Sequence, residues 1–139
     1  MLSQAVRVYI RRFGVLPGQR VVVATNNDDA YATADAVADA GGEVVAILDS
    51  RPQWSEAATA AKSRFQVFID ARPVGTKGNS HHLKRVEATI RTERRRFEAD
   101  LLALSGGFTP AVHLHSQAGG ALDWRGDVQA FVPGASRRP

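Results

Sequence analysis

The chain contains no cysteine, and this absence excludes several kinds of chemistry at once. Disulfides, catalysis by a thiolate, and zinc or iron–sulfur sites with cysteine ligands all require that residue. The chain also has no apolar run long enough to span a membrane, and residues 1–20 lack the apolar core of a signal peptide. We therefore expect a cytoplasmic protein without a membrane partner.

The remaining composition is that of an ordinary folded domain. The 139 residues are 44% hydrophobic and 23% charged, which is enough to bury a sizeable core. The net charge of +4 raises nucleic acid as a partner, but the arginines are scattered and no nucleic-acid-binding motif is present. The run Arg94–Arg96 is expected at a strand edge or hairpin turn, where charge prevents edge-to-edge pairing. We therefore expect no nucleic-acid partner.

The segment Arg20–Pro52 has the pattern of a strand–helix–strand unit. Arg20–Ala24 is a short apolar run, as in strands buried on both faces of a parallel sheet. Ala30–Ala40 is rich in alanine at helical spacing, and two glycines predict the end of that helix. Glu43–Leu48 then reads as the second strand. This pattern predicts a Rossmann-like α/β fold.

The loop that joins the first strand to the helix lacks the glycines of a dinucleotide-binding fingerprint. Against G-x-G-x-x-G/A, it satisfies only the last position, because it reads Thr25-Asn26-Asn27-Asp28-Asp29-Ala30. Asn27 would crowd a pyrophosphate, and the two aspartates lie where a phosphate would meet the helix N-terminus. We therefore expect a helix capped by its own carboxylates. The alternative is that the loop is a functional pyrophosphate site. In that case Thr25, Asn26 and Asn27 would bind the cofactor.

Asp49 follows the second strand about twenty residues after this loop, where dinucleotide-binding units keep a ribose-binding acid. An aspartate at a strand end is also commonly a helix cap or a turn residue, so both roles stay open. Arg51 is placed either to accept a 2′-phosphate or to pair with Asp49.

The rest of the pattern predicts a parallel sheet with flanking helices and an antiparallel β-meander on one face. The expected helices are Ala5–Phe13 and Glu56–Arg64, and the further parallel strands are Gln66–Ile69 and Leu101–Leu104. The expected antiparallel strands are Arg72–Thr76, Leu83–Ile90 and Arg95–Phe97, with a turn at Thr92–Arg94. These elements predict a domain over residues 1–110, with the meander at about 72–98, and a C-terminal segment over residues 111–139.

Other residues with possible chemistry favour structural roles. The histidine pairs His81-His82 and His113-x-His115 have no acidic ligand fixed near them, so we expect capping or solvated histidines and no metal site. Ser105 lacks a histidine and an acid at a recognisable spacing, so no catalytic residue is assigned. Trp54 and Trp124 lie among polar residues and are expected to anchor loops or a neighbouring domain rather than stack on a flavin.

The stretch Asp100–Pro110, a buried strand followed by small residues and a proline, resembles the D-x-V-x-x-A-x-G-x-x-P segment of two-dinucleotide-domain flavoproteins. In that superfamily, this segment is the point at which the chain leaves the nicotinamide-type domain and returns to the flavin-type domain. Several further tracts resemble the α subunit of heterotetrameric sarcosine oxidase, and opine oxidase and related amine dehydrogenase subunits share parts of the pattern. These tracts are Val21–Tyr31, Val45–Pro52, Asp100–Gly107, His113–Trp124 and Ala130–Gly134.

The resemblance implies that this chain is the second dinucleotide-type domain of a longer α subunit. That subunit carries an NAD-binding fingerprint upstream and a folate-binding, aminomethyltransferase-like module downstream. The implied complex holds NAD, FAD and FMN, and it demethylates a secondary amine, sarcosine to glycine, at a flavin in a partner β subunit. The fragment alone is then expected to bind no cofactor, to be inactive, and to serve as a structural and interface domain. A stand-alone NAD(P)-binding module of an oxidoreductase is the alternative.

Two further expectations follow from the resemblance. Small residues let a backbone pass close to a cofactor or a neighbouring domain, so Ser105, Gly106 and Gly107 are candidate cofactor-binding residues. The C-terminal segment leads back toward a flavin-type domain that this chain lacks, so it should expose apolar side chains: Phe108, Leu114, Leu122, Trp124 and Phe131. The isolated chain should then self-associate or be poorly ordered beyond about Ala111.

Overall fold

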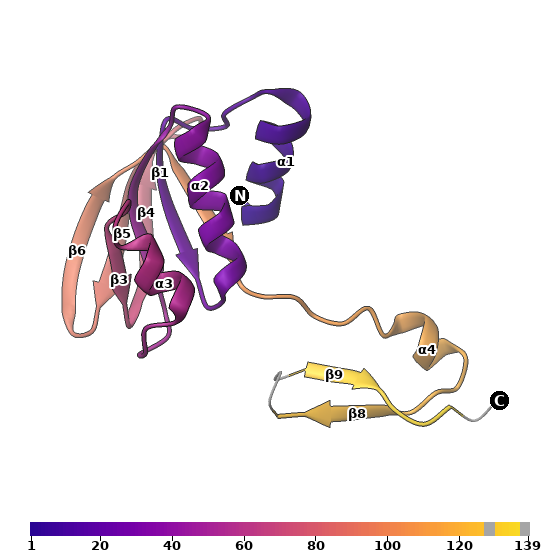
Figure 1. Cartoon of the computed structure of the whole chain (residues 1–139). Helices are drawn as coiled ribbons and strands as arrows, with labels where there is room; N and C mark the ends of the chain where they lie inside the picture. The colour runs from indigo at the N-terminus through magenta and orange to yellow at the C-terminus, as the bar shows by residue number, and fades with distance from the viewer. Residues whose placement is uncertain (127–129, 137–139) are drawn as a thin grey trace. The chain divides into compact units, whose positions relative to one another are not determined.

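The structure, a computed structural model, describes residues 1–126 and 130–136 (Figure 1). It divides the chain into two units, residues 1–107 and residues 108–139, and each is described by itself. No helix in the described part of the chain combines the length and apolar character needed to cross a membrane.

A four-stranded parallel sheet runs through the centre of the first unit. Its strands are β1 (Arg20–Thr25), β2 (Glu43–Asp49), β3 (Val67–Ile69) and β7 (Leu101–Ser105), in the order β3-β2-β1-β7. The valines of β1 are buried on both faces, which explains the uninterrupted apolar run in the sequence. In the register of the sheet, Val23 lies between Ile47 of β2 and Ala103 of β7.

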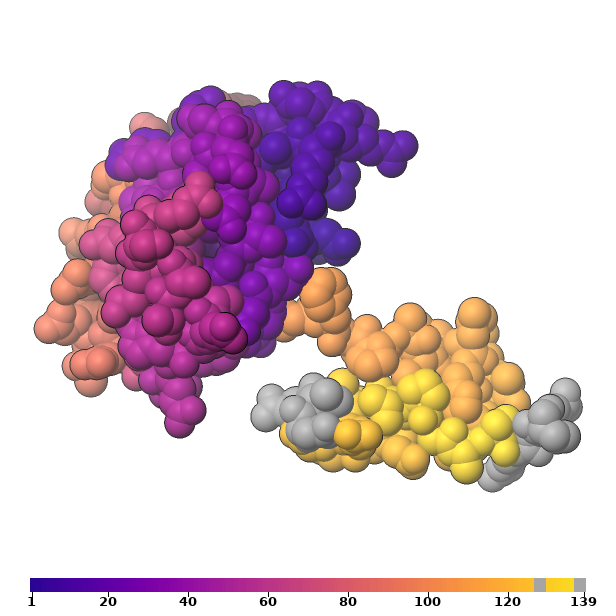
Figure 2. All heavy atoms as spheres, in the orientation of Figure 1, coloured from indigo at the N-terminus to yellow at the C-terminus, as the bar shows by residue number. Residues whose placement is uncertain are grey.

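Helices cover one face of this sheet. They are α1 (Ser3–Phe13), the 3₁₀ turn η1 (Asp28–Ala30), α2 (Tyr31–Asp39) and α3 (Glu56–Ala61). Figure 2 shows this helical layer from outside, with α1 in indigo beside α2 in purple. The core beneath it joins Val6 of α1 and Val37 of α2 to Val23 and Ile47 of the sheet, and all four side chains are fully buried.

An antiparallel meander covers the opposite face. Its strands are β4 (Ala71–Gly78), β5 (Leu83–Ile90) and β6 (Glu93–Glu98), in the order β4-β5-β6. Val86, Ala88 and Phe97 of the meander pack on Val22 and Leu48 of the parallel sheet in a second core. The predicted fold class, a Rossmann-like parallel sheet with flanking helices and a meander on one face, is therefore confirmed.

Element boundaries differ from the sequence-based expectation at a few points. The turn between β5 and β6 lies at residues 91–92, not at Thr92–Arg94, so the predicted turn is wrong. Arg91 makes this turn with a left-handed φ of 55°, a conformation that its residue type does not signal. Arg94–Arg96 all lie within β6, which is an edge strand of the meander, as expected for a charged run.

The second unit is small and holds little apolar core. It consists of α4 (His113–Gln117) and an antiparallel pair, β8 (Leu122–Arg125) and β9 (Ala130–Pro133). The only buried residue among those described in this unit is Ala130. The five apolar side chains predicted to be uncovered are all exposed: Phe108, Leu114, Leu122, Trp124 and Phe131.

Candidate functional site

The carboxyl ends of β1, β2 and β7 meet at one edge of the parallel sheet, where open α/β sheets bind ligands. Thr25 pairs with Asp49 on one side and with Ser105 on the other, so the structure brings the predicted site residues to this edge. The seven candidates there are Thr25, Asn26, Asn27, Asp49, Ser105, Gly106 and Gly107.

The loop after β1 is built around the side chain of Asn27. The Thr25 hydroxyl donates to the Asn27 carbonyl over 2.7 Å and accepts from the Asn27 amide over 3.0 Å, which closes a tight turn without glycine. The Asn27 side chain then accepts from the Asp29 backbone amide over 3.0 Å and caps η1. The expectation that the aspartates cap this helix is therefore wrong, because the residue just before them does so.

The same loop is bonded to the end of β7. Asn27 Nδ2 donates to the Ser105 carbonyl over 3.1 Å, and Asn26 Nδ2 donates to the Gly106 carbonyl over 3.2 Å. The Ser105 hydroxyl donates to Asn27 Oδ1 over 3.3 Å. Two asparagine side chains thus fill the position where a dinucleotide fingerprint has glycine and open space.

The two glycines after β7 meet different constraints. Gly107 has a φ of 89°, which favours glycine, whereas a Cβ atom built at Gly106 would meet no atom within 4 Å. There is therefore room for another group to approach the backbone at Gly106, but no neighbouring atom in the described chain requires glycine at this position.

Asp49 is fully buried, and its carboxylate is saturated with donors. Oδ2 accepts from the Tyr31 hydroxyl over 2.8 Å and from Arg51 Nη2 over 2.6 Å. Oδ1 accepts from the Arg51 backbone amide and from Arg51 Nε, each over 3.0 Å. A carboxylate offers about four acceptor positions, so none is left for a ribose hydroxyl unless Arg51 moves.

Arg51 joins the acids of two neighbouring loops. Besides Asp49, its Nη2 contacts Asp28 Oδ1 over 2.6 Å, and Ser55 Oγ donates to the same oxygen over 2.7 Å. Ser55 also caps α3 by accepting from the Ala58 amide over 3.1 Å. Of the two roles left open for Arg51, the structure shows the pairing with Asp49.

The electrostatics of this network follow from these contacts. Hydrogen bonds from Arg51 and Ser55 hold the pKa of Asp28 below its ordinary value. The hydrogen bond to Asp49 raises the pKa of Arg51, which keeps the guanidinium charged. Burial, followed by the hydrogen bond to Asp49, raises the pKa of the Tyr31 hydroxyl above its usual range. The network therefore holds two carboxylates and a guanidinium, with Tyr31 as a neutral donor.

Asp29 pairs with a different arginine. Its Oδ2 lies 2.5 Å from Arg7 Nη2 of α1, so each acid of the loop has an arginine partner, although Asp28 shares Arg51 with Asp49. Sequence reasoning missed three partners, Arg7, Tyr31 and Ser55. Ser55 carried a signal, because a serine directly before a helix is a favoured N-cap, whereas nothing in the local pattern marks Arg7 or Tyr31.

A cavity of about 310 Å³ opens at the same edge of the sheet. Its walls are mostly apolar and come from β1, β2, β4 and β7, including Ala24, Leu48, Pro73 and Leu104. Asn26 is the only amide side chain in its lining, and no titratable side chain lines it. The cavity can therefore bind an apolar group, but it offers no acid or base for catalysis.

The other candidate residues lie apart from this edge. His81 and His82 occupy a turn whose backbone amides donate to Asn79 Oδ1, and His115 Nε2 lies 3.0 Å from the Ala121 carbonyl. Within the described ranges, no three histidine or acidic side chains come together as metal ligands. Trp54 is covered by Lys62 at 4.0 Å, and Trp124 packs edge-to-face on Phe131 at 5.1 Å.

Comparison with known protein families finds no match. Individual relatives do match. The sarcosine oxidase α subunit of Corynebacterium sp. (strain U-96) is 43% identical over 96% of this chain. The chain is a homologue of one segment of sarcosine oxidase α subunits. The α subunit of Corynebacterium sp. (strain P-1) is 44% identical over 98% of the chain, and that of Rhizobium meliloti (strain 1021) is 35% identical over 97%.

The chain spans only a small part of these sarcosine oxidase α subunits. It matches 14% of the strain U-96 subunit, 15% of the strain P-1 subunit and 13% of the Rhizobium subunit. The predicted resemblance to a fragment of a longer α subunit is therefore confirmed.

Solved structures show the same fold at low sequence identity. A thioredoxin reductase from T. acidophilum has a TM-score of 0.64 at 23% identity, over 77% of this chain and 37% of its own. An L-proline dehydrogenase from P. horikoshii has a TM-score of 0.61 at 17% identity, over 94% of this chain and 20% of its own. These likenesses confirm the Rossmann-like α/β fold and carry no argument about the ligand.

Proposed function

We propose that this chain is the second dinucleotide-type domain of a sarcosine oxidase-like oxidoreductase, and that it supports the complex without holding a nucleotide itself. The similarity to α subunits over nearly the whole chain supports the first part. In this proposal the parent complex oxidatively demethylates a secondary amine, sarcosine to glycine, at a flavin carried by a partner subunit. NAD and flavin belong to other parts of that complex, and a cytoplasmic location stays a prediction.

The observation that carries the second part is the saturated carboxylate of Asp49. Dinucleotide-type domains use this acid to accept hydrogen bonds from a ribose, and here Arg51 and Tyr31 fill its acceptor positions. Displacing the Arg51 side chain would leave a buried carboxylate without its counter-charge, which costs several kcal/mol. A nucleotide would have to overcome that cost as well as repulsion from Asp28.

The pyrophosphate position supports the same proposal. The side chain of Asn27 crosses from the helix start to the Ser105 carbonyl, so the backbone there is covered rather than open. Asp28 and Asp29 bring negative charge to the end of the helix that would otherwise attract a phosphate. Their pairing with Arg51 and Arg7 closes the loop, and because Arg51 is shared between Asp28 and Asp49, the network keeps an excess of negative charge.

Titration calorimetry of the chain with NAD and with NADP tests the nucleotide part of the proposal. We expect no binding tighter than about 1 mM, a free energy of about −4 kcal/mol. Arg51→Ala should bring a small gain, because it frees acceptor positions on Asp49, and Arg72→Ala is the control for removing an arginine elsewhere. Micromolar binding that Asp49→Ala abolishes would show instead a stand-alone NAD(P)-binding module.

Complementation tests the subunit part of the proposal. The α subunit of Corynebacterium sp. (strain U-96), with its matching segment deleted, is co-produced with this chain carrying an affinity tag. We expect the two to purify together, because the chain should occupy the position of the missing segment. The tagged chain alone should show no flavin absorption. A chain that purifies alone from the mixture, or that carries its own flavin, contradicts the proposal.

A further inference from the structure

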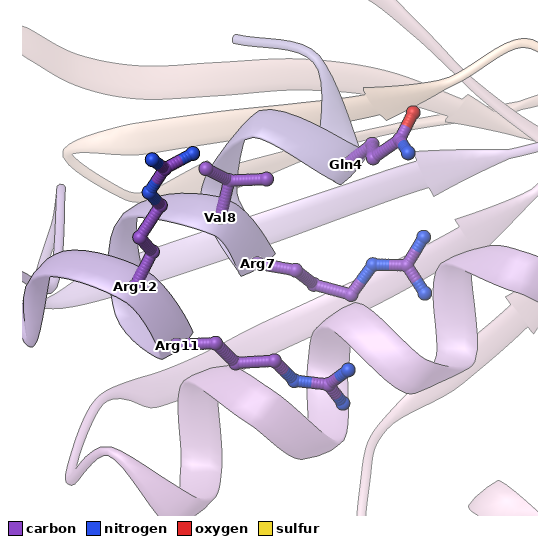
Figure 3. A pocket seen from close by; sticks show the side chains of 5 residues that line it. All are labelled: Gln4, Arg7, Val8, Arg11 and Arg12. Carbon is purple, nitrogen blue, oxygen red and sulfur yellow. The ribbon is translucent and has the colours of Figure 1, made fainter.

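Helix α1 presents a basic, hollowed face that the described chain leaves open. Five residues at helical spacing line it: Gln4, Arg7, Val8, Arg11 and Arg12. They border a cavity of about 640 Å³, which we call the α1 groove. Figure 3 shows the side chains of Arg7 and Arg11 extending from α1 in the same direction, with Val8 and Arg12 on the adjoining side of the helix.

The positive charge of the α1 groove is only partly compensated. Arg7 is neutralised by Asp29, but Arg11 has no hydrogen-bond or ion-pair partner among the described residues. The one interaction of Arg12 found in that part of the chain is with the Phe13 ring, at 5.6 Å. The acids of the neighbouring helix α2, Asp35 and Asp39, are both paired with Arg64. Two guanidinium groups therefore remain available to an outside anion.

Exposed apolar side chains accompany these charges. Val8 in the groove is 43% exposed, Leu2 directly before α1 is 71% exposed, and Phe13 at the end of α1 is 60% exposed. Exposed apolar groups gathered on one element mark interaction sites, and arginine and aromatic residues are enriched at the centres of protein interfaces.

We propose that the α1 groove docks an acidic, amphipathic segment of the remaining α-subunit polypeptide. The proposal rests on the proposed function, and three observations carry it: the uncompensated arginines, the apolar floor at Val8, and the length of the relatives. This chain matches only 14% of the strain U-96 α subunit, so most of that polypeptide is outside the chain and available as the occupant.

The recognition follows from the chemistry of the groove. Arg11 and Arg12 each offer a planar fork of donors that binds a carboxylate in two-point fashion. Gln4 supplies an amide for a backbone carbonyl, and Val8 gives an apolar contact between the charged ends. Electrostatic attraction of this kind is sensitive to salt and sets the register of docking.

Nuclear magnetic resonance titration of the whole chain tests the proposal. The probe is a synthetic helical peptide of about 15 residues, with glutamates along one face and leucines beside them. We expect shifts confined to α1, and weaker binding as ionic strength rises from about 0.05 M to about 0.3 M. Arg11→Glu with Arg12→Glu should weaken binding at least about tenfold, because like charges then meet.

The matched control reverses two exposed arginines of β6, Arg94→Glu with Arg96→Glu, which changes the net charge equally. We expect this variant to bind within about twofold of the original chain, and the dispersion of each spectrum reports that the variant is folded. Equal losses in both variants, or shifts outside α1, would mean that the peptide responds to net charge alone and would overturn the proposal.

Two further probes test whether the α1 groove binds a nucleic acid or an anionic membrane rather than a protein segment. A single-stranded oligonucleotide or phosphatidylserine vesicles that perturb α1 more strongly than the peptide would overturn docking of a protein segment. Failure of the α1 groove to bind the peptide can be distinguished from failure of the proposed function. A chain that complements the truncated α subunit while its α1 groove ignores the acidic peptide would keep the function and lose this inference.

Discussion

The two units of the chain differ in how they bury their apolar residues. The first unit sandwiches a parallel sheet between helices and a meander, and it has two cores with many fully buried side chains. In the described part of the second unit only Ala130 is buried, and its aromatic pair, Trp124 and Phe131, is 58% and 50% exposed. A two-stranded hairpin is at best marginally stable alone, so we expect the first unit to fold by itself and the second to need a covering surface.

This contrast explains where polar networks lie. The first unit places Asp49 beneath Arg51 and Tyr31, an arrangement that only a well-packed surround can hold. The second unit has no comparable buried charge in its described residues. The first unit therefore holds a buried polar network at its sheet edge, whereas the described part of the second unit exposes apolar side chains.

The largest effect should come from the core of the first unit. Ile47→Ala removes a fully buried side chain from the centre of the sheet, and we expect it to lower the free energy of unfolding by about 2–5 kcal/mol. Leu114→Ala in the second unit should change it by less than about 0.5 kcal/mol, because that side chain is 80% exposed. Urea denaturation monitored by circular dichroism measures the free energy of unfolding of both variants. Equal losses in the two variants would contradict the difference between the units.

The two units also differ at their helix starts. Asn27 caps the η1–α2 start with its side chain, whereas Val112 before α4 makes no such bond. Asn27→Ala should therefore cost about 1 kcal/mol and Val112→Ala less than about 0.5 kcal/mol, by the same denaturation measurement. Asn27→Asp keeps the capping oxygen but loses the donor to the Ser105 carbonyl, so it separates the contribution of the cap from that of this hydrogen bond. An unchanged stability in Asn27→Ala would place the stabilising contact elsewhere in the loop.

A smaller effect concerns the pH dependence of Asp28. Because Arg51 and Ser55 hold its pKa below the ordinary value of about 3.9, its stabilising contribution is present above that pH. The contribution is lost as pH falls through the lowered pKa. We expect Asp28→Asn to be less stable than the original chain at pH near 5 by under about 1 kcal/mol, since Asp28 is half exposed. The difference should shrink as the pH falls through the lowered pKa of Asp28, and a constant difference would contradict this account.

The regular elements of the first unit could be predicted from the sequence for a clear physical reason. Strands such as β1 are buried on both faces, so their apolar runs are continuous, and the alanines of α2 show its buried side. The β5–β6 turn was misplaced because Arg91 adopts a left-handed conformation that usually signals glycine or asparagine. The elements of the second unit are too short to show a clear hydrophobic periodicity, so the sequence did not predict them.

The candidate site could be located but not resolved in detail. Thr25, Asp49 and Ser105 were separate candidates in the sequence, and the structure brings them together at the ends of three neighbouring strands. Four consecutive residues, Asn26–Asp29, all favour helix caps, so local preference could not select Asn27 as the capping residue. The choice depends on Arg7 and Arg51, which arrive from elsewhere in the fold and pair with the aspartates. Contacts of that kind are set by tertiary structure.

The position of Arg51 has a consequence for how the domain responds to the cell. A domain that is completed by a diffusible ligand gains stability with the logarithm of that ligand's concentration, so its folded fraction follows metabolism. Arg51 is only two residues from Asp49 along the chain, and this tether gives its guanidinium a high, constant effective concentration at the carboxylate. Under the proposed function, the stability of the sheet edge therefore does not depend on the supply of nucleotide.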